Sequence, residues 1–173
     1  MTQAVTKNTE QQDESLAGLA GKYLTFLLGD ESYGIEILKV QEIIGMQTIT
    51  RIPRTPEYVK GVINLRGKVI PVIDLRLRFG MEAAEVSRKT CIIVVQVSKA
   101  DASVTMGIVV DEVSEVLEIS SGEIEPAPGF GTSVETSFIL GMAKTENSVK
   151  ILLDIDRIMS EEEMDALAKS AAV

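Results

Sequence analysis

Short runs of apolar residues, many alternating with polar ones, cover most of the chain and have the length and period of β-strands. The first five runs are YLTFLL (23–28), YGIEI (33–37), VQEIIGM (40–46), VINL (62–65) and KVIPVIDL (68–75). After RLRFGMEAAEVSRK, which we expect to form a short helix and a connector, five more follow: TCIIVVQV (90–97), VTMGIVV (104–110), VSEVLEI (113–119), SFILGMA (137–143) and SVKILLDI (148–155). The pattern predicts a mainly β protein with two sets of five strands.

The two ends of the chain depart from this pattern. Residues 1–20 are polar and have no hydrophobic periodicity, which predicts a flexible tail with order beginning near Lys22. Near the other end, Ser160 is followed three residues later by Glu163, the spacing of a helix capping box, and acidic residues fill the first turn. We therefore expect a C-terminal helix over residues 160–170.

The second set of strands repeats the first. YGIEILKVQEII (33–44) nearly recurs as MGIVVDEVSEVL (106–117), at an offset of 107 − 34 = 73 residues. A later correspondence has an offset of 141 − 61 = 80, because the second copy has a longer loop around PAPGFGTSVETS, where insertions cost little. Three pairs of residues mark the repeat: Gly34 with Gly107, Gly61 with Gly141, and Asp74 with Asp154. Chance similarity between Val- and Ile-rich strands is the alternative, but the shared order favours two units, each able to close into a small barrel.

The composition leaves little room for catalytic chemistry. The chain has no histidine, so the commonest general base and the commonest transition-metal ligand are missing. Its one cysteine, Cys91, lies in an apolar run and is expected to be a buried hydrophobe. The carboxylates of Asp154, Asp156 and 161–163 fall at a strand end or a helix start, where capping explains them. No phosphate-binding glycine motif is present, so we expect no enzyme activity, metal or cofactor.

The charge is unevenly distributed. The net charge is −9, yet residues 51–89 hold nine Lys and Arg against four Asp and Glu, and residues 101–173 hold four against fifteen. The basic segment admits a nucleic-acid-binding barrel, but the negative field of the whole chain opposes phosphate binding. Three Tyr and four Phe also offer few rings for stacking. A basic face that meets a protein partner is the simpler reading.

Two stretches suggest protein recognition. In KGVINLRGKVIPVIDL (60–75), Gly61 and Gly67 bracket a strand and place Arg66 at its end, where the guanidinium can bind a carboxylate. An ordinary surface arginine is the plain alternative. In residues 33–46 the apolar side chains point to both faces of the strands, which predicts either a seam between the two units or a partner site.

No apolar run reaches the roughly 18 residues needed to span a bilayer, and the polar start MTQAVTKNTEQQDES does not have the pattern of a signal peptide. We therefore expect a cytoplasmic protein.

The motifs YGIEILKVQEI, KGVINLRGKVIPVIDLR, GIVVDEVSEVL and EPAPGF resemble those of the CheW family of bacterial chemotaxis coupling proteins over about residues 20–165. The resemblance implies one domain over residues 21–173, built of two small five-stranded β-barrels packed on a shared apolar seam. The first barrel would cover about residues 22–80 and the second 89–155. It further implies a non-enzymatic adaptor that joins the histidine kinase CheA to the cytoplasmic hairpin tip of methyl-accepting chemoreceptors, recruited to membrane-associated receptor arrays.

The resemblance also assigns site residues. The receptor-binding set is Val40, Arg66, Gly107 and Val116. The kinase-binding set is Ile37, Glu42, Ile43, Gly61 and Phe130, of which Phe130 would serve a second kinase contact. Some relatives carry a basic residue where this chain has Glu125 and an acid where it has Gly129, so the electrostatic part of that second contact differs here. The alternatives are an adaptor for a non-chemotactic kinase pathway, such as surface motility, and a small-barrel nucleic-acid binder.

Overall fold

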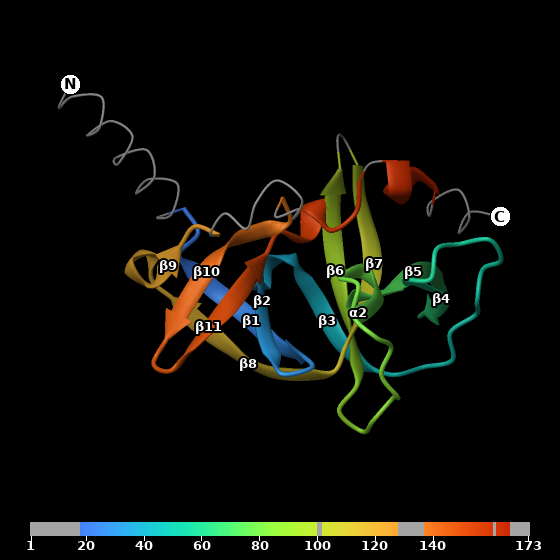
Figure 1. Ribbon diagram of the computed structural model, residues 1–173. Coiled ribbons are helices and arrows are strands. Elements are labelled where there is room, and N and C mark those ends of the chain that lie inside the picture. The colour runs from blue at the N-terminus through green and yellow to red at the C-terminus, as the bar shows by residue number, and fades with distance from the viewer. Residues whose placement is uncertain (1–17, 100–101, 128–136, 161, 167–173) are drawn as a thin grey trace.

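The computed structural model describes residues 18–99, 102–127, 137–160 and 162–166, and it contains two sheets that lie side by side (Figure 1). The six-stranded sheet has the order β8-β1-β2-β11-β10-β9 and the five-stranded sheet the order β3-β6-β7-β5-β4. The strands are β1 (Gly21–Leu28), β2 (Glu31–Glu36), β3 (Val40–Gly45), β4 (Val59–Leu65), β5 (Lys68–Asp74), β6 (Cys91–Lys99), β7 (Ala102–Val110), β8 (Glu112–Ile119), β9 (Ile124–Glu125), β10 (Ile139–Thr145) and β11 (Ser148–Leu153).

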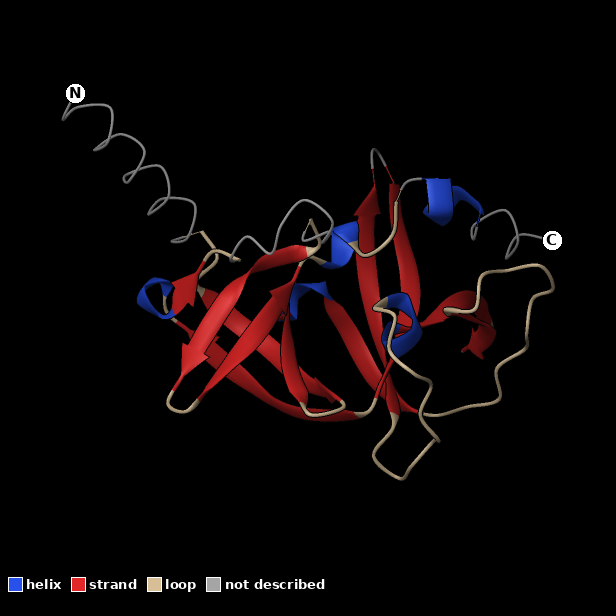
Figure 2. Cartoon of the chain, in the orientation of Figure 1, coloured by secondary structure: helices blue, strands red, loops and turns tan. Residues whose placement is uncertain are grey.

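Among the described residues, helical structure is confined to short segments, coloured blue in Figure 2. They are η1 (Ile37–Lys39), α2 (Leu75–Arg78), η2 (Ser121–Glu123), η3 (Ile155–Arg157) and a C-terminal helix at residues 162–166. All ten predicted strands and the short connecting helix are confirmed, so the mainly β prediction is correct. The two-residue strand β9 was not predicted, because a run of two residues carries no period.

Each sheet combines strands from both repeats. The five-stranded sheet is continuous in the chain over residues 40–110, whereas the six-stranded sheet joins residues 21–36 to residues 112–153. The predicted barrel boundaries at 22–80 and 89–155 are therefore wrong. Hydrophobic period locates strands but not their partners, and here parallel pairings of β2 with β11 and of β5 with β7 join the first hairpin of each repeat to the last hairpin of the other.

The sequence repeat is confirmed by the topology. When each strand is replaced by its counterpart in the other repeat, the order β8-β1-β2-β11-β10 becomes β3-β6-β7-β5-β4. The repeated acids also have equivalent roles, because Asp74 accepts a hydrogen bond from the backbone of Arg76, and Asp154 accepts one from the backbone of Asp156. The backbone N–H of each acid donates over 2.7 Å, to the carbonyls of Tyr58 and Phe138 respectively.

The largest apolar core lies between the sheets, and we call it the seam cluster. It includes Phe26 and Ile35 of the six-stranded sheet and Ile93 and Ile108 of the five-stranded sheet, all with 0% exposure. Two smaller clusters contain residues of one sheet each. The shared apolar seam is therefore confirmed, and it explains why β6 reads as a continuous apolar run: its alternate residues contribute to two different cores.

The C-terminal helix begins with the predicted capping box. The backbone N–H of Ser160 donates to the Glu163 carboxylate over 2.9 Å, and the N–H of Glu163 donates to the Ser160 hydroxyl over 3.1 Å. Residues 162–166 are helical, and the predicted end at residue 170 lies outside the described residues. Glu163 also accepts hydrogen bonds from Tyr58 and Arg78, which fix this helix to the loop before β4 and to α2.

Protonation of Glu163 should loosen this attachment. Burial raises the pKa of its carboxyl, but the hydrogen bonds from Tyr58 and Ser160 and the charge of Arg78 outweigh burial and hold the pKa below its usual value. A lowered folded pKa stabilises the fold above the unfolded pKa, and that stability is lost as the pH falls through the folded value.

We therefore expect Glu163→Gln to lower the free energy of unfolding by about 1 kcal/mol at pH 7. The difference from the native protein should shrink as the pH falls below the unfolded pKa of about 4.3 and through the lower folded pKa, where the native carboxyl takes up its proton. Thermal unfolding followed by circular dichroism across this pH range measures both. The exposed neighbour Glu162, changed to Gln, is the control. A difference that is constant with pH would contradict the assignment.

Gly61 should tolerate no side chain. Its φ is +140°, and a Cβ placed there would lie 2.0 Å from the carbonyl oxygen of Thr50. We expect Gly61→Ala to lower the free energy of unfolding by about 3 kcal/mol, through backbone strain and overpacking. Gly45→Ala is the matched control, because a Cβ at Gly45 meets nothing within 4 Å. Equal denaturation midpoints for the two variants would show this account of Gly61 to be wrong.

Candidate protein-binding surface

Two exposed apolar side chains lie at equivalent places at the edge of the seam. Ile43 on β3 is 45% exposed and Val116 on β8 is 48% exposed. Ile43 is paired with Ile93 and Val116 with Leu24, and both partners belong to the seam cluster. Because directly opposed residues of antiparallel strands share a face, the apolar surface of the seam continues outward onto β3 and β8. These are edge strands of the two sheets, and the two residues are 116 − 43 = 73 positions apart, the repeat offset.

The chain leading to Ile43 adds to this surface. Ile37 in η1 and Val40 at the start of β3 are partly exposed and pack against the seam cluster. Both were predicted as site residues, and together with Ile43 they form one apolar strip that is partly open to solvent. An open strip of this kind is typical of surfaces that bind other proteins.

Arg66 and Glu42 form a bidentate ion pair beside this strip. The Arg66 Nη2 lies 2.6 Å from Glu42 Oε1, and Nη1 lies 3.1 Å from Oε2. Arg66 is in the turn between β4 and β5 with φ of +50°, and Asn64 Oδ1 supports the turn by accepting from the N–H of Gly67. The pair brings the turn at the end of β4 against β3, the two opposite edges of the five-stranded sheet.

The sequence did not predict this contact, because the two residues are 24 positions apart and were assigned to different partners. In the six-stranded sheet the equivalent positions are Glu115 and Glu146, both acidic, so the repeat does not conserve the pair.

Two predicted site residues are buried. Gly61 lies under the backbone of Thr50, and a Cβ at Gly107 would lie 2.7 Å from Ile92 Cγ2 and 3.3 Å from Val72 Cγ2. Neither glycine can contact a partner directly in this conformation, so their part in any surface is to allow the strands above them to pack closely. The remaining predicted residue, Phe130, lies outside the described residues.

Ion pairing reduces the positive charge of the basic segment. Of the nine Lys and Arg in residues 51–89, five form ion pairs with other described residues: Lys60 with Asp74, Arg66 with Glu42, Arg76 with Asp111, Arg78 with Glu163, and Lys89 with Glu112. Charges already paired within the protein contribute little to phosphate binding. This argues against the nucleic-acid alternative.

Among the described residues we find neither an activated cysteine nor a cluster of metal-binding side chains. Burial raises the pKa of the Cys91 thiol, the opposite of what a nucleophilic thiolate requires. Within residues 18–99, 102–127, 137–160 and 162–166, no three His, Cys, Asp or Glu side chains come together in a way that could hold a metal ion. Among the same residues, no helix is both long and apolar enough to cross a membrane.

Known proteins share both the sequence and this arrangement of strands. The CheW-like domain family matches residues 22–163, which include both sheets. The chain is 43% identical over 152 residues to the chemotaxis protein CheW of Klebsiella aerogenes, covering 86% of this chain and 89% of that one. It is 38% identical over 143 residues to the chemotaxis protein CheW of Rhizobium meliloti, covering 83% and 90%.

A solved structure has a similar fold. The crystal structure of the scaffolding protein TtCheW from Thermoanaerobacter tengcongensis is similar with a TM-score of 0.73 and 38% identity, covering 83% of this chain and 95% of that one. With matches that cover both sheets in sequence and in structure, the chain belongs to the CheW-like family of chemotaxis scaffold proteins.

Proposed function

We propose that this protein is a non-catalytic adaptor that couples methyl-accepting chemoreceptors to the histidine kinase CheA. It would act in the cytoplasm and be recruited to membrane-associated receptor arrays. Membership of the CheW-like family supports this role. The observation that carries the proposal is the pair of exposed apolar residues Ile43 and Val116, which extend the seam onto the surface at equivalent places of two different sheets.

The receptor side of the proposal uses the edge of the seam. A helical hairpin can place an apolar stripe in a groove between two packed units, which is a common mode of peptide recognition. Val40 and Val116 supply apolar surface from the two sheets, and Arg66, 67% exposed at its side chain, supplies donors at the border. Gly107 supports this surface from below.

The first kinase contact of the proposal uses one sheet only. Ile37, Glu42 and Ile43 lie on η1 and β3, at an edge of the five-stranded sheet, and present apolar and carboxylate groups to the regulatory domain of CheA. Gly61 on β4 has no side chain, which lets the segment at Thr50, downstream of β3, lie close against β4. Phe130 would provide a second kinase contact, by resemblance alone. The Arg66–Glu42 ion pair marks the border that the two surfaces share.

Calorimetric titration tests both surfaces. We expect saturable binding of the CheA regulatory domain and, separately, of a receptor hairpin fragment from the same organism. Ile43→Asp should weaken kinase-domain binding at least about tenfold and Val116→Asp should do so for the receptor fragment, because a charge is then desolvated at an apolar contact. Val69→Asp and Val149→Asp are matched controls, since these valines are 52% and 50% exposed on β5 and β11, outside both surfaces. No binding of either partner to the folded native protein would contradict the proposal and direct the search to another kinase pathway.

Reversing the charge of Arg66 should affect binding more than folding. Arg66→Glu places two carboxylates together where an exposed ion pair stood, and solvent screens exposed charges, so we expect the midpoint of thermal unfolding to change little. Receptor-fragment affinity should fall, and the double variant Arg66→Glu with Glu42→Arg should restore the ion pair but not the receptor contact. Loss of the thermal transition in Arg66→Glu would instead make Arg66 a structural residue.

A further inference from the structure

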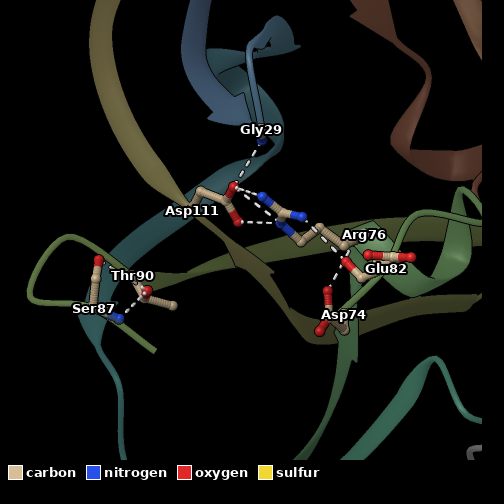
Figure 3. A network of polar contacts seen from close by, with 7 residues as sticks. All are labelled: Gly29, Asp74, Arg76, Glu82, Ser87, Thr90 and Asp111. Atoms are coloured by element: carbon tan, nitrogen blue, oxygen red, sulfur yellow. Dashed lines mark hydrogen bonds and ion pairs between the residues drawn. The ribbon is translucent and has the colours of Figure 1, made fainter. Parts of the chain in front are cut away.

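The described chain passes between the two sheets twice, from β2 to β3 and from β7 to β8, and each crossing carries an ion pair. At the crossing from β7 to β8, Asp111 binds Arg76, the second residue of α2 (Figure 3). Arg76 Nε lies 2.8 Å from Asp111 Oδ1, and Arg76 Nη2 lies 2.6 Å from Oδ2. The backbone N–H of Gly29, in the turn between β1 and β2, donates to the same Oδ2 over 2.7 Å. We call this group the first clamp.

The first clamp connects the two sheets. Arg76 follows β5 of the five-stranded sheet, and its position is fixed by hydrogen bonds from its backbone N–H to Asp74 and from its Nη1 to the carbonyl of Glu82. Gly29 belongs to the six-stranded sheet. Asp111 therefore holds a guanidinium from one sheet and a backbone N–H from the other.

A second clamp occupies the other crossing. Lys39, between β2 and β3, places its Nζ 2.8 Å from Oδ2 of Asp156 in η3, which follows β11 of the six-stranded sheet. The backbone N–H of Ser98, in β6 of the five-stranded sheet, donates to Asp156 Oδ1 over 2.8 Å. This carboxylate also holds a backbone N–H from the opposite sheet.

The two clamps lie at corresponding crossings but have opposite polarity. Arg76 and Asp156 are at matching positions, since 156 − 76 = 80 is the later repeat offset. In the first clamp the cation follows the last strand of the repeat and the carboxylate lies on the crossing, and in the second clamp the two are exchanged. The repeat has thus kept an ion pair at each crossing without keeping the residue types, which favours a role for the pairing itself.

We propose that the two clamps fix the angle between the sheets and thereby set the spacing between the apolar surfaces at Val40 and Val116. This inference rests on the proposed receptor-binding function. Apolar contacts in the seam are non-directional and leave the sheets free to shift against each other, whereas charge-assisted hydrogen bonds to two oxygens of one carboxylate fix direction as well as distance. The four side chains are 19–27% exposed, so solvent screens them less than a surface pair.

Pulsed electron paramagnetic resonance measures the spacing of the sheets directly. Spin labels at Val69→Cys and Val149→Cys, in a Cys91→Ala background, place one reporter on an exposed position of each sheet. We expect Asp111→Asn combined with Asp156→Asn to broaden or shift the distance distribution. Glu125→Gln is the control, because it removes an exposed ion pair to Lys144 between neighbouring strands of one sheet. An unchanged distribution in the combined variant would overturn the inference.

Affinities for the receptor fragment and the kinase domain show whether the clamps position the two sheets or only stabilise the fold. If the combined variant holds the receptor-binding geometry about one fifth of the time, the apparent dissociation constant for the receptor fragment rises about fivefold. For Asp111→Asn alone, affinity for the kinase domain should stay unchanged, because the first clamp contacts no residue of that proposed surface. Equal weakening toward both partners, or unchanged receptor affinity despite a changed spacing, would also overturn the inference.

Charge reversal provides a rescue. Arg76→Asp alone places two carboxylates together and should disturb the spacing most. Arg76→Asp with Asp111→Lys gives the first clamp the polarity of the second and should restore both the spacing and the receptor affinity; failure of the folded double variant to do so would contradict the pairing. If the native protein does not bind the receptor fragment, the proposed function fails, and the label distances still decide whether the clamps position the sheets.

Discussion

The structure depends on one layer of buried apolar side chains between two sheets. Each sheet is small, and among the described residues the cluster enclosed by the six-stranded sheet contains five that are buried, Tyr23, Ile119, Ile124, Ala143 and Leu152. A core of that size supplies little stability by itself. The seam cluster adds nineteen buried residues from both sheets and the segments that follow them, so neither sheet is complete without the other. The interface between the two halves is the main core of the protein.

Strand exchange joins the two repeats within each sheet. The first hairpin of each repeat pairs with the last hairpin of the other, through parallel contacts at Gly34 with Leu152 and at Gly107 with Val72. Glycine at the second strand of each repeat lets the backbones and the neighbouring side chains approach closely there. The two repeats therefore cannot separate without breaking backbone hydrogen bonds within both sheets. In our proposal, the ion pairs at the two crossings fix the relative orientation of the sheets, which apolar packing alone does not specify.

The two sheets have nearly the same strand order but carry different charged residues on their surfaces. Ile43 and Val116 occupy matching places, but only the five-stranded sheet has an arginine and a glutamate paired beside its exposed isoleucine, whereas the matching positions of the six-stranded sheet carry two glutamates. Equivalent backbones with unlike charges suit an adaptor that must bind two unlike proteins at once, because charge selects between partners that present similar apolar surfaces. Each contact can be modest where several act together in an array.

The sequence alone determined the strands, the repeat and the helix start at Ser160, because hydrophobic period and capping spacing act over a few residues. The apolar seam was one of two alternatives that the pattern left open, and the family resemblance favoured it. It also carried the family motifs, from which the candidate residues Ile37, Val40, Glu42, Ile43, Arg66 and Val116 were identified, and the structure places all six at least partly at the surface. Tertiary structure decided which strands pair, that Gly61 and Gly107 are buried, that Arg66 binds Glu42, and that Arg76 and Lys39 hold the two crossings. These contacts join residues 24 to 117 positions apart, and nothing in the local order of one chain specifies which distant partner a strand edge or a charged side chain will meet.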